Sequence, residues 1–204
     1  MMKNPTADMR FDWSGKPERA GISEIARILR RSGAVALLPT ETVYGLTGRV
    51  SDPLCRQRIM DLKHRDPAKH LGWFVSDLAQ LEKYGITLTG KAAELAGRFC
   101  PGPLTLIVDR NDGTTVGFRI PDHPLLLALL RELDEPLLQT SANRSGCPNA
   151  LNVDEALSML SGTPDAVADA GAIAPDAQAS TIVDCTAGHL RVIRQGMLRV
   201  DEFL

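Results

Sequence analysis

The chain lacks the motifs by which nucleotide-binding and hydrolytic enzymes are most often recognised. It contains no G-x-x-x-x-G-K-[ST] sequence, which excludes a P-loop, and no G-x-G-x-x-G or G-x-S-x-G sequence. Aromatic residues make up only 4% of the chain, so there are few platforms for base stacking. The four cysteines include no C-x-x-C pair, which disfavours a zinc site and predicts free thiols.

Strong net charge and long apolar runs are also missing. The formal net charge is −2 over 204 residues, so any basic site must be local. No stretch approaches the roughly 18 apolar residues of a membrane helix, and residues 1–13 are polar, without the apolar core of a signal peptide. We therefore expect a cytoplasmic protein with no membrane partner.

Capping residues mark the expected helices. Asp52 followed by Pro53 is typical of a helix start, and Asn152 with Glu155 resembles a capping box. Ser23 is expected to cap the first helix. Short apolar runs predict strands at about 34–38, 73–75, 104–108, 115–120, 137–140, 166–168, 181–185 and 190–193.

The predicted elements alternate, but several strands follow one another without a helix between them. This order favours a mixed sheet over a purely parallel one. We expect a single α/β domain over residues 20–204, with an open, twisted, mixed sheet flanked by helices, and an N-terminal extension over residues 1–19. The segment 39–46 is expected to leave its strand as a loop.

A local basic cluster stands out in this nearly neutral chain. Residues 56–70 hold five Lys/Arg and two acidic residues. Lys63 and Arg65 fall where the helix should end, and residues two apart point the same way on extended backbone. On extended backbone both cations would converge on one polyphosphate. The alternative is a solvated helix face.

Two other segments place polar residues at or in apolar strands. Thr140-Ser141-Ala142-Asn143 follows a buried strand, where Ser141 and Asn143 can hold phosphate or ribose oxygens; the alternative is an ordinary turn. Arg119 lies in an otherwise apolar strand and needs a partner. It is either half of a structural salt bridge or a clamp for the carboxylate of a small acid. No Ser/His/Asp arrangement is evident, so positioning and charge stabilisation are the expected chemistry.

Seven short segments, in order, resemble the YrdC/Sua5 family, whose members make threonylcarbamoyl-adenylate for tRNA modification. The similarity spans about residues 20–200 and favours the short YrdC type. The segments are Pro39-Thr40-Glu41-Thr42-Val43-Tyr44-Gly45-Leu46, Lys63-His64-Arg65, Pro101-Gly102-Pro103-Leu104-Thr105, Val116-Gly117-Phe118-Arg119-Ile120-Pro121-Asp122-His123-Pro124, Thr140-Ser141-Ala142-Asn143-Arg144-Ser145-Gly146, Ser180-Thr181-Ile182-Val183-Asp184 and Ile193-Arg194-Gln195-Gly196.

The resemblance implies a concave, positively charged cavity that binds ATP and L-threonine. Threonine, bicarbonate and ATP would give threonylcarbamoyl-adenylate and diphosphate, with Lys63, Arg65 and Mg²⁺ offsetting charge on the departing diphosphate. No metal site formed by protein residues is expected. The implied ATP-binding residues are Lys63, Arg65, Lys69, Thr115, Ser141, Asn143, Asn149 and Arg194. The implied threonine-binding residues are Thr42, Arg119, Ser180 and the backbone at Gln139.

The resemblance implies partners beyond the small molecules, namely tRNA and a threonylcarbamoyl-transferase complex. Two other functions remain open from the sequence. One is a double-stranded RNA- or ribosome-binding module that uses the basic concave face. The other is a carbamoyl-transfer enzyme of the same fold. The chain departs from many relatives at His70, and from some at Phe74, where they carry a threonine-contacting His.

Overall fold

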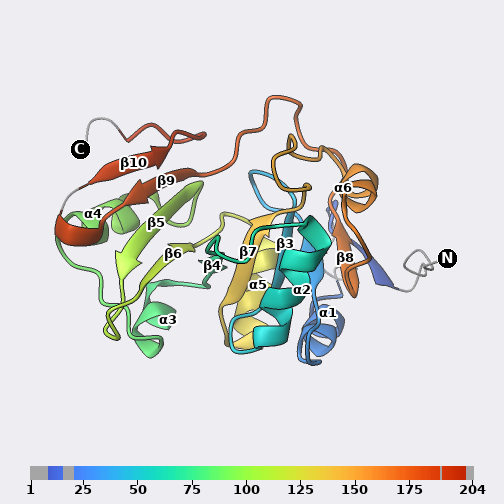
Figure 1. The fold of residues 1–204 in the computed structure, drawn as a ribbon, viewed down its shortest axis with the longest axis horizontal. Helices are drawn as coiled ribbons and strands as arrows, with labels where there is room; N and C mark the ends of the chain where they lie inside the picture. The colour runs from blue at the N-terminus through green and yellow to red at the C-terminus, as the bar shows by residue number, and fades with distance from the viewer. Residues whose placement is uncertain (1–8, 16–20, 189, 201–204) are drawn as a thin grey trace.

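The fold is an open ten-stranded sheet with helices on both faces (Figure 1). The computed structural model describes residues 9–15, 21–188 and 190–200. The strand order is β1-β8-β2-β3-β7-β4-β6-β5-β9-β10. The sheet contains both parallel pairs (β1/β8, β2/β8, β4/β6, β5/β9) and antiparallel pairs, which confirms the predicted mixed sheet.

The elements have the following bounds. The strands are β1 Arg10–Asp12, β2 Ala36–Leu38, β3 Gly45–Arg49, β4 Gly72–Phe74, β5 Leu104–Asp109, β6 Thr115–Arg119, β7 Leu137–Ser141, β8 Ala166–Asp169, β9 Thr181–Asp184 and β10 Arg191–Arg194. The helices are α1 Ile22–Leu29, α2 Pro53–Lys63, α3 Leu78–Lys83, α4 Gly90–Phe99, α5 Pro124–Leu133 and α6 Val153–Met159. None of the helices in these described ranges is long and apolar enough to cross a membrane.

Local capping chemistry explains most helix starts. The Asp52 carboxylate accepts from the backbone N–H of Leu54, and Asn152 accepts from the N–H of Glu155, as the sequence predicts. Ser23 is not a cap. α1 begins at Ile22, two residues before the start that a Ser23 cap would give, because the left-handed backbone of Gly21 (φ 58°) already turns the chain into the helix.

Two strands of the sheet, β3 and β1, were not predicted from the sequence. β3 pairs with both β2 and β7 at the centre of the sheet, although its first two residues were expected to be loop. β1 lies in the expected N-terminal extension, yet it pairs with β8 at one edge. Both strands are short, and β3 contains two glycines, so long-range pairing rather than local propensity makes them strands. Residues 1–8 and 16–19 of that extension lie outside the described residues.

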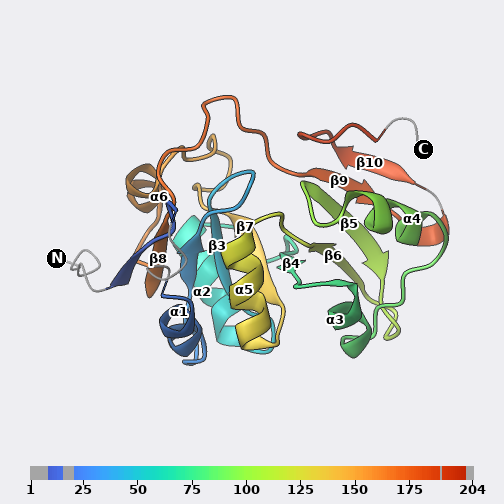
Figure 2. The ribbon, with the colours of Figure 1, turned by 180° about the vertical axis from the view of Figure 1, so that it is seen from behind.

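Two apolar clusters hold the layers together. One packs α1 and α5 against one face of the sheet, as Figure 2 shows from behind. The other is larger and joins α2, α3, α4 and α6 to the opposite face and to the β5–β6–β9 part of the sheet. With both faces covered, the sheet is a rigid platform, and loops at its strand ends are placed accurately relative to one another.

Candidate functional site

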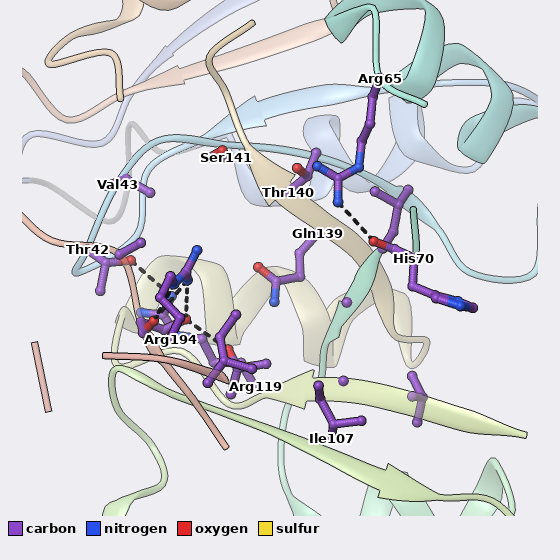
Figure 3. A pocket seen from close by; sticks show the side chains of 18 of the residues that line it. Thr42, Val43, Arg65, His70, Ile107, Arg119, Gln139, Thr140, Ser141 and Arg194 are labelled. Atoms are coloured by element: carbon purple, nitrogen blue, oxygen red, sulfur yellow. Dashed lines mark hydrogen bonds between the residues drawn. The ribbon is translucent and has the colours of Figure 1, made fainter. Parts of the chain in front are cut away.

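A cavity of about 370 Å³ lies where β7, β4, β6 and β5 meet, and segments before and within β9 and at the end of β10 close it. Its volume lies in the range of small-ligand sites. It brings together most of the residues predicted for ATP and threonine: Thr42, Arg65, Thr115, Arg119, Gln139, Ser141, Asn149, Ser180 and Arg194 (Figure 3). Lys63, Lys69 and Asn143 are not among its lining residues.

Arg119 and Arg194 form one end of the cavity. Arg119 is only 3% exposed; its Nη1 donates to Thr42 Oγ1 at 2.9 Å and its Nε donates to the carbonyl O of Gly102 at 3.1 Å. Arg194 donates through Nε and Nη2 to the carbonyl O of Ser180, at 3.1 and 2.9 Å. Burial, and then the neighbouring Arg119, lower the pKa of Arg194. This end therefore concentrates positive charge in a poorly solvated place.

The third nitrogen of the Arg119 guanidinium, Nη2, lies beside the carboxylate of Glu41. Arg119 Nη2 lies 2.6 Å from Glu41 Oε1, an ion pair without hydrogen-bond geometry. Glu41 Oε1 also accepts from the N–H of Asp122 at 2.9 Å, while its buried Oε2 has no hydrogen-bond partner among the described residues. The structural salt bridge considered for Arg119 is thus present. The position of Arg119 in the cavity wall leaves the substrate role open as a proposal.

Arg65 forms the opposite end. Its Nη2 donates to the carbonyl O of His70 at 3.1 Å, and its buried Nε has no partner in the part of the chain that the structure describes. Burial is the main cause that lowers the pKa of Arg65. A half-buried guanidinium with free donors is suited to an anionic ligand such as phosphate.

Lys63 and Arg65 do not converge, which corrects the prediction of an extended backbone. α2 continues through Lys63, and His64 then adopts a left-handed conformation (φ 49°). The N–H of Arg65 bonds back to the carbonyl O of Met60 at 2.9 Å. This helix ending sends Arg65 to the cavity and Lys63 into the protein interior.

Lys63 lies behind the cavity wall, not in it. The side chain is among the most buried in the protein at 1% exposure, and Nζ donates to the carbonyl oxygens of Ser141 and Asn143. Burial, with a smaller contribution from Arg65, lowers the pKa of Lys63 to about 8. None of the ion pairs between described residues involves Lys63. Its contacts are those of a support for the end of β7.

Asn143 and Lys69 also lie away from the cavity. The Asn143 amide donates to the carbonyl O of Cys147 at 2.5 Å and of Arg144 at 3.2 Å, so it shapes the loop that follows Ser141. Its buried Oδ1 has no partner in the described ranges. Lys69 is exposed on the surface. Their roles toward ATP remain predictions.

Several wall residues were not predicted from the sequence. Besides the side chain of Gln139, where only the backbone was predicted to act, these are Val43, His70, Leu71, Gly72, Thr105, Ile107, Val116, Gly117, Thr140, Ala179 and Ile182. Strand alternation offered a clue, because Gln139 and Ser141 lie two apart on β7 and face the same side.

The cavity suits anions and not cations. Three arginines line it, and its wall contains no Asp or Glu among the residues that the structure describes. Those residues also include no group of three or more His, Cys, Asp or Glu able to hold a metal ion. The described wall thus offers no carboxylate to Mg²⁺, an ion that prefers carboxylates together with substrate phosphates.

Comparisons with known proteins agree with this architecture. The chain is 34% identical over 191 residues to the threonylcarbamoyl-AMP synthase of Bacillus subtilis, covering 89% of this chain and 55% of that protein. It is similar to the crystal structure of Pyrococcus abyssi Sua5 complexed with L-threonine, with a TM-score of 0.83, 28% identity and coverage of 95% of this chain and 58% of that one.

The fold is also that of Escherichia coli YciO, with a TM-score of 0.83 at 24% identity and coverage of 96% and 98% of the two chains. The chain spans about half the length of the Bacillus and Pyrococcus relatives. A family model described as "Telomere recombination" matches residues 28–196. On this evidence the chain belongs to the Sua5/YciO/YrdC family.

Proposed function

We propose that this protein is an L-threonylcarbamoyladenylate synthase, a nucleotidyltransferase that acts on L-threonine, bicarbonate and ATP. The observation that carries the proposal is the cavity with arginines at both ends and no acidic residue in its described wall. An amino-acid carboxylate, a carbamate and a triphosphate are all anions, and they can be joined only where their mutual repulsion is offset. The names of the relatives support the same activity.

The chemistry has two steps. The neutral amine of threonine combines with bicarbonate to give the N-carboxylate (carbamate) and water. A carbamate oxygen then attacks the α-phosphorus of ATP; the bond from this phosphorus to the bridging oxygen breaks, and diphosphate leaves with the electron pair. The chain supplies no obvious nucleophile, so its contribution is orientation and charge stabilisation.

The two ends of the cavity take different parts of the reaction. The Thr42–Arg119–Ser180 end suits the carboxylate and hydroxyl of threonine. The Arg65 end, with the Ser141 loop, suits the phosphates. We expect ATP to enter as its Mg²⁺ complex, since the described wall contains no Asp or Glu to hold the ion. Lys63 acts indirectly by holding the carbonyl groups of that loop.

The test is release of diphosphate from ATP that depends on both threonine and bicarbonate. We expect Arg65→Ala to lower this activity by ~10²–10³, because removing one charge-stabilising donor costs on the order of 2–4 kcal/mol. Arg131→Ala, at an exposed position of α5, is the matched control and should retain full activity. Diphosphate release that does not depend on threonine would refute the proposal.

Two further measurements distinguish the alternative functions from the proposed one. AMP formation driven by carbamoyl phosphate, without threonine, would support a carbamoyl-transfer enzyme. Salt-sensitive RNA binding without ATP turnover would support an RNA-binding module. The Mg²⁺ requirement, tRNA and transferase partners, and the cytoplasmic location remain predictions.

A further inference from the structure

Two glycines make a hollow beside Gln139 in the middle of the sheet. Gly72 of β4 pairs with Gln139 of β7, and Gly117 of β6 lies next to Gly72, since the following residues Trp73 and Phe118 pair in parallel register. A β-carbon added at Gly72 would lie 2.7 Å from Gln139 Nε2 and 3.2 Å from the carbonyl O of Gly117. The absence of a side chain at Gly72 is therefore what lets the Gln139 amide lie against the cavity floor.

The Gln139 amide has no protein partner there. It makes no hydrogen bond within the described part of the chain, whereas the nearby Thr42 and Ser180 are bonded to Arg119 and Arg194. Figure 3 shows it between the Thr42–Arg194–Arg119 group on one side and Arg65 with His70 on the other. A carboxamide brings two donors and one acceptor to this midpoint.

The midpoint is where the two substrates must be joined. We infer that the side-chain carboxamide of Gln139 binds the carbamate that threonine and bicarbonate form; this inference rests on the proposed function. A carbamate is planar, with an N–H beside two acceptor oxygens. A carboxamide is complementary to it, because its NH₂ can donate to a carbamate oxygen while its carbonyl oxygen accepts the carbamate N–H.

This pairing gives Gln139 a role that the arginines at the two ends of the cavity do not supply. Arginines neutralise charge, but they offer no acceptor for the carbamate N–H. The carboxamide hydrogen-bonds to both an oxygen and the N–H of the carbamate, and these two bonds fix the plane of the carbamate. It thereby leaves the second carbamate oxygen directed toward the phosphate end, ready to attack the α-phosphorus.

Binding linkage tests the inference without turnover. Threonine affinity is measured by calorimetry with and without bicarbonate, in the presence of the α,β-methylene analogue of ATP, which cannot release diphosphate. In the wild type, bicarbonate should tighten threonine binding about tenfold, the size of one hydrogen bond to a charged group. Gln139→Ala should abolish this gain and leave threonine affinity in bicarbonate-free buffer within about twofold.

Two further variants sharpen the result. Gly72→Ala keeps the glutamine but displaces its amide, so this variant should also lose the tightening of threonine binding by bicarbonate. It replaces Gln139→Ala as the test if that variant folds poorly. Gln57→Ala alters an exposed glutamine on α2 that bonds only to Asp61, and should behave as wild type.

Each outcome decides the inference. A bicarbonate effect that survives in Gln139→Ala, or that is missing in the wild type, overturns it. Threonine binding that weakens equally with and without bicarbonate also overturns it, since Gln139 would then contact threonine itself. A wild type that shows the effect but releases no diphosphate from ATP would refute the proposed function and leave the carbamate subsite standing.

Discussion

Replacing Lys63 by methionine probes the most unusual charge in the structure. Its ammonium group is buried, donates to the carbonyl oxygens of Ser141 and Asn143, and has no carboxylate partner among the ion pairs of the described chain. Burial lowers its pKa from the ordinary 10.5 to about 8. Methionine replaces the four-carbon stem of lysine by an apolar stem of the same number of atoms, and it removes the charged nitrogen with both of its hydrogen bonds.

The depressed pKa sets the sign and size of the effect. Each pKa unit corresponds to about 1.4 kcal/mol, so holding Lys63 protonated at pH 7 costs the folded protein about 3 kcal/mol. The unfolded chain binds more protons than the folded chain between about pH 8 and 10.5. The contribution of Lys63 to stability therefore rises with pH through this window, and about 2 kcal/mol is regained between pH 7 and 10.

The assay is urea unfolding of the wild type and Lys63→Met at pH 7 and pH 10. The two unpaired carbonyls cost the variant about 1–3 kcal/mol each at either pH, so only the charge contribution changes. The free energy of unfolding of the wild type should increase relative to the variant by about 2 kcal/mol on going to pH 10. Lys91→Met, at an exposed site on α4, should show no such change. A difference that is the same at both pH values would refute the burial of this charge.

Four further results are expected. Arg119→Ala should raise the KM for threonine by ~30–100-fold, more than the KM for ATP, since one charged pair is worth about 2–3 kcal/mol; an unchanged KM with lost stability would make the arginine purely structural. Glu41→Gln should lower the KM for threonine, because Glu41 occupies a donor of Arg119 that the substrate carboxylate needs; a higher KM would contradict this competition. In competition binding, valine should fail badly and serine should bind only ~10–200-fold worse than threonine, whereas valine binding like threonine would show that the hydroxyl is not recognised. Gly196→Ala should lower the melting temperature by about 4–8 °C for a cost of roughly 2 kcal/mol, because its β-carbon would lie 2.1 Å from the carbonyl O of Ala179, and an unchanged melting temperature would show that the segment adjusts freely.

The parts of the fold that sequence predicts well are those with local chemistry. The start of α2 at Asp52 and Pro53 follows from a side-chain acceptor and a fixed φ, both visible in four residues. β3 was missed because its Gly-Leu-Thr-Gly-Arg sequence has no strand preference of its own. It is a strand because β2 and β7 lie on either side of it.

In the site, too, features that depend on long-range contacts were not predicted from the sequence. The resemblance named residues that the fold does bring together, among them Arg65, Arg119 and Arg194. It did not reveal that His64 would turn the chain and separate Lys63 from Arg65, because a non-glycine residue in the left-handed region depends on tertiary contacts. The ion pair of Glu41 with Arg119 likewise joins residues far apart in sequence.

The order of the strands decides when the chain first has a complete cavity. The wall of the cavity comes from β7, β4, β6 and β5 and from segments as late in the chain as Arg194, while neighbouring strands such as β1 and β8 are far apart in sequence. Such topologies fold slowly, because segments far apart in sequence lose conformational entropy on meeting before their contacts stabilise the sheet. The residues that line the cavity are spread from Thr42 to Arg194, so a nascent or half-paired chain has no complete site for the proposed substrates. Ligands can therefore stabilise only the finished protein by mass action, and catalytic competence is gained in the same step as the completed sheet.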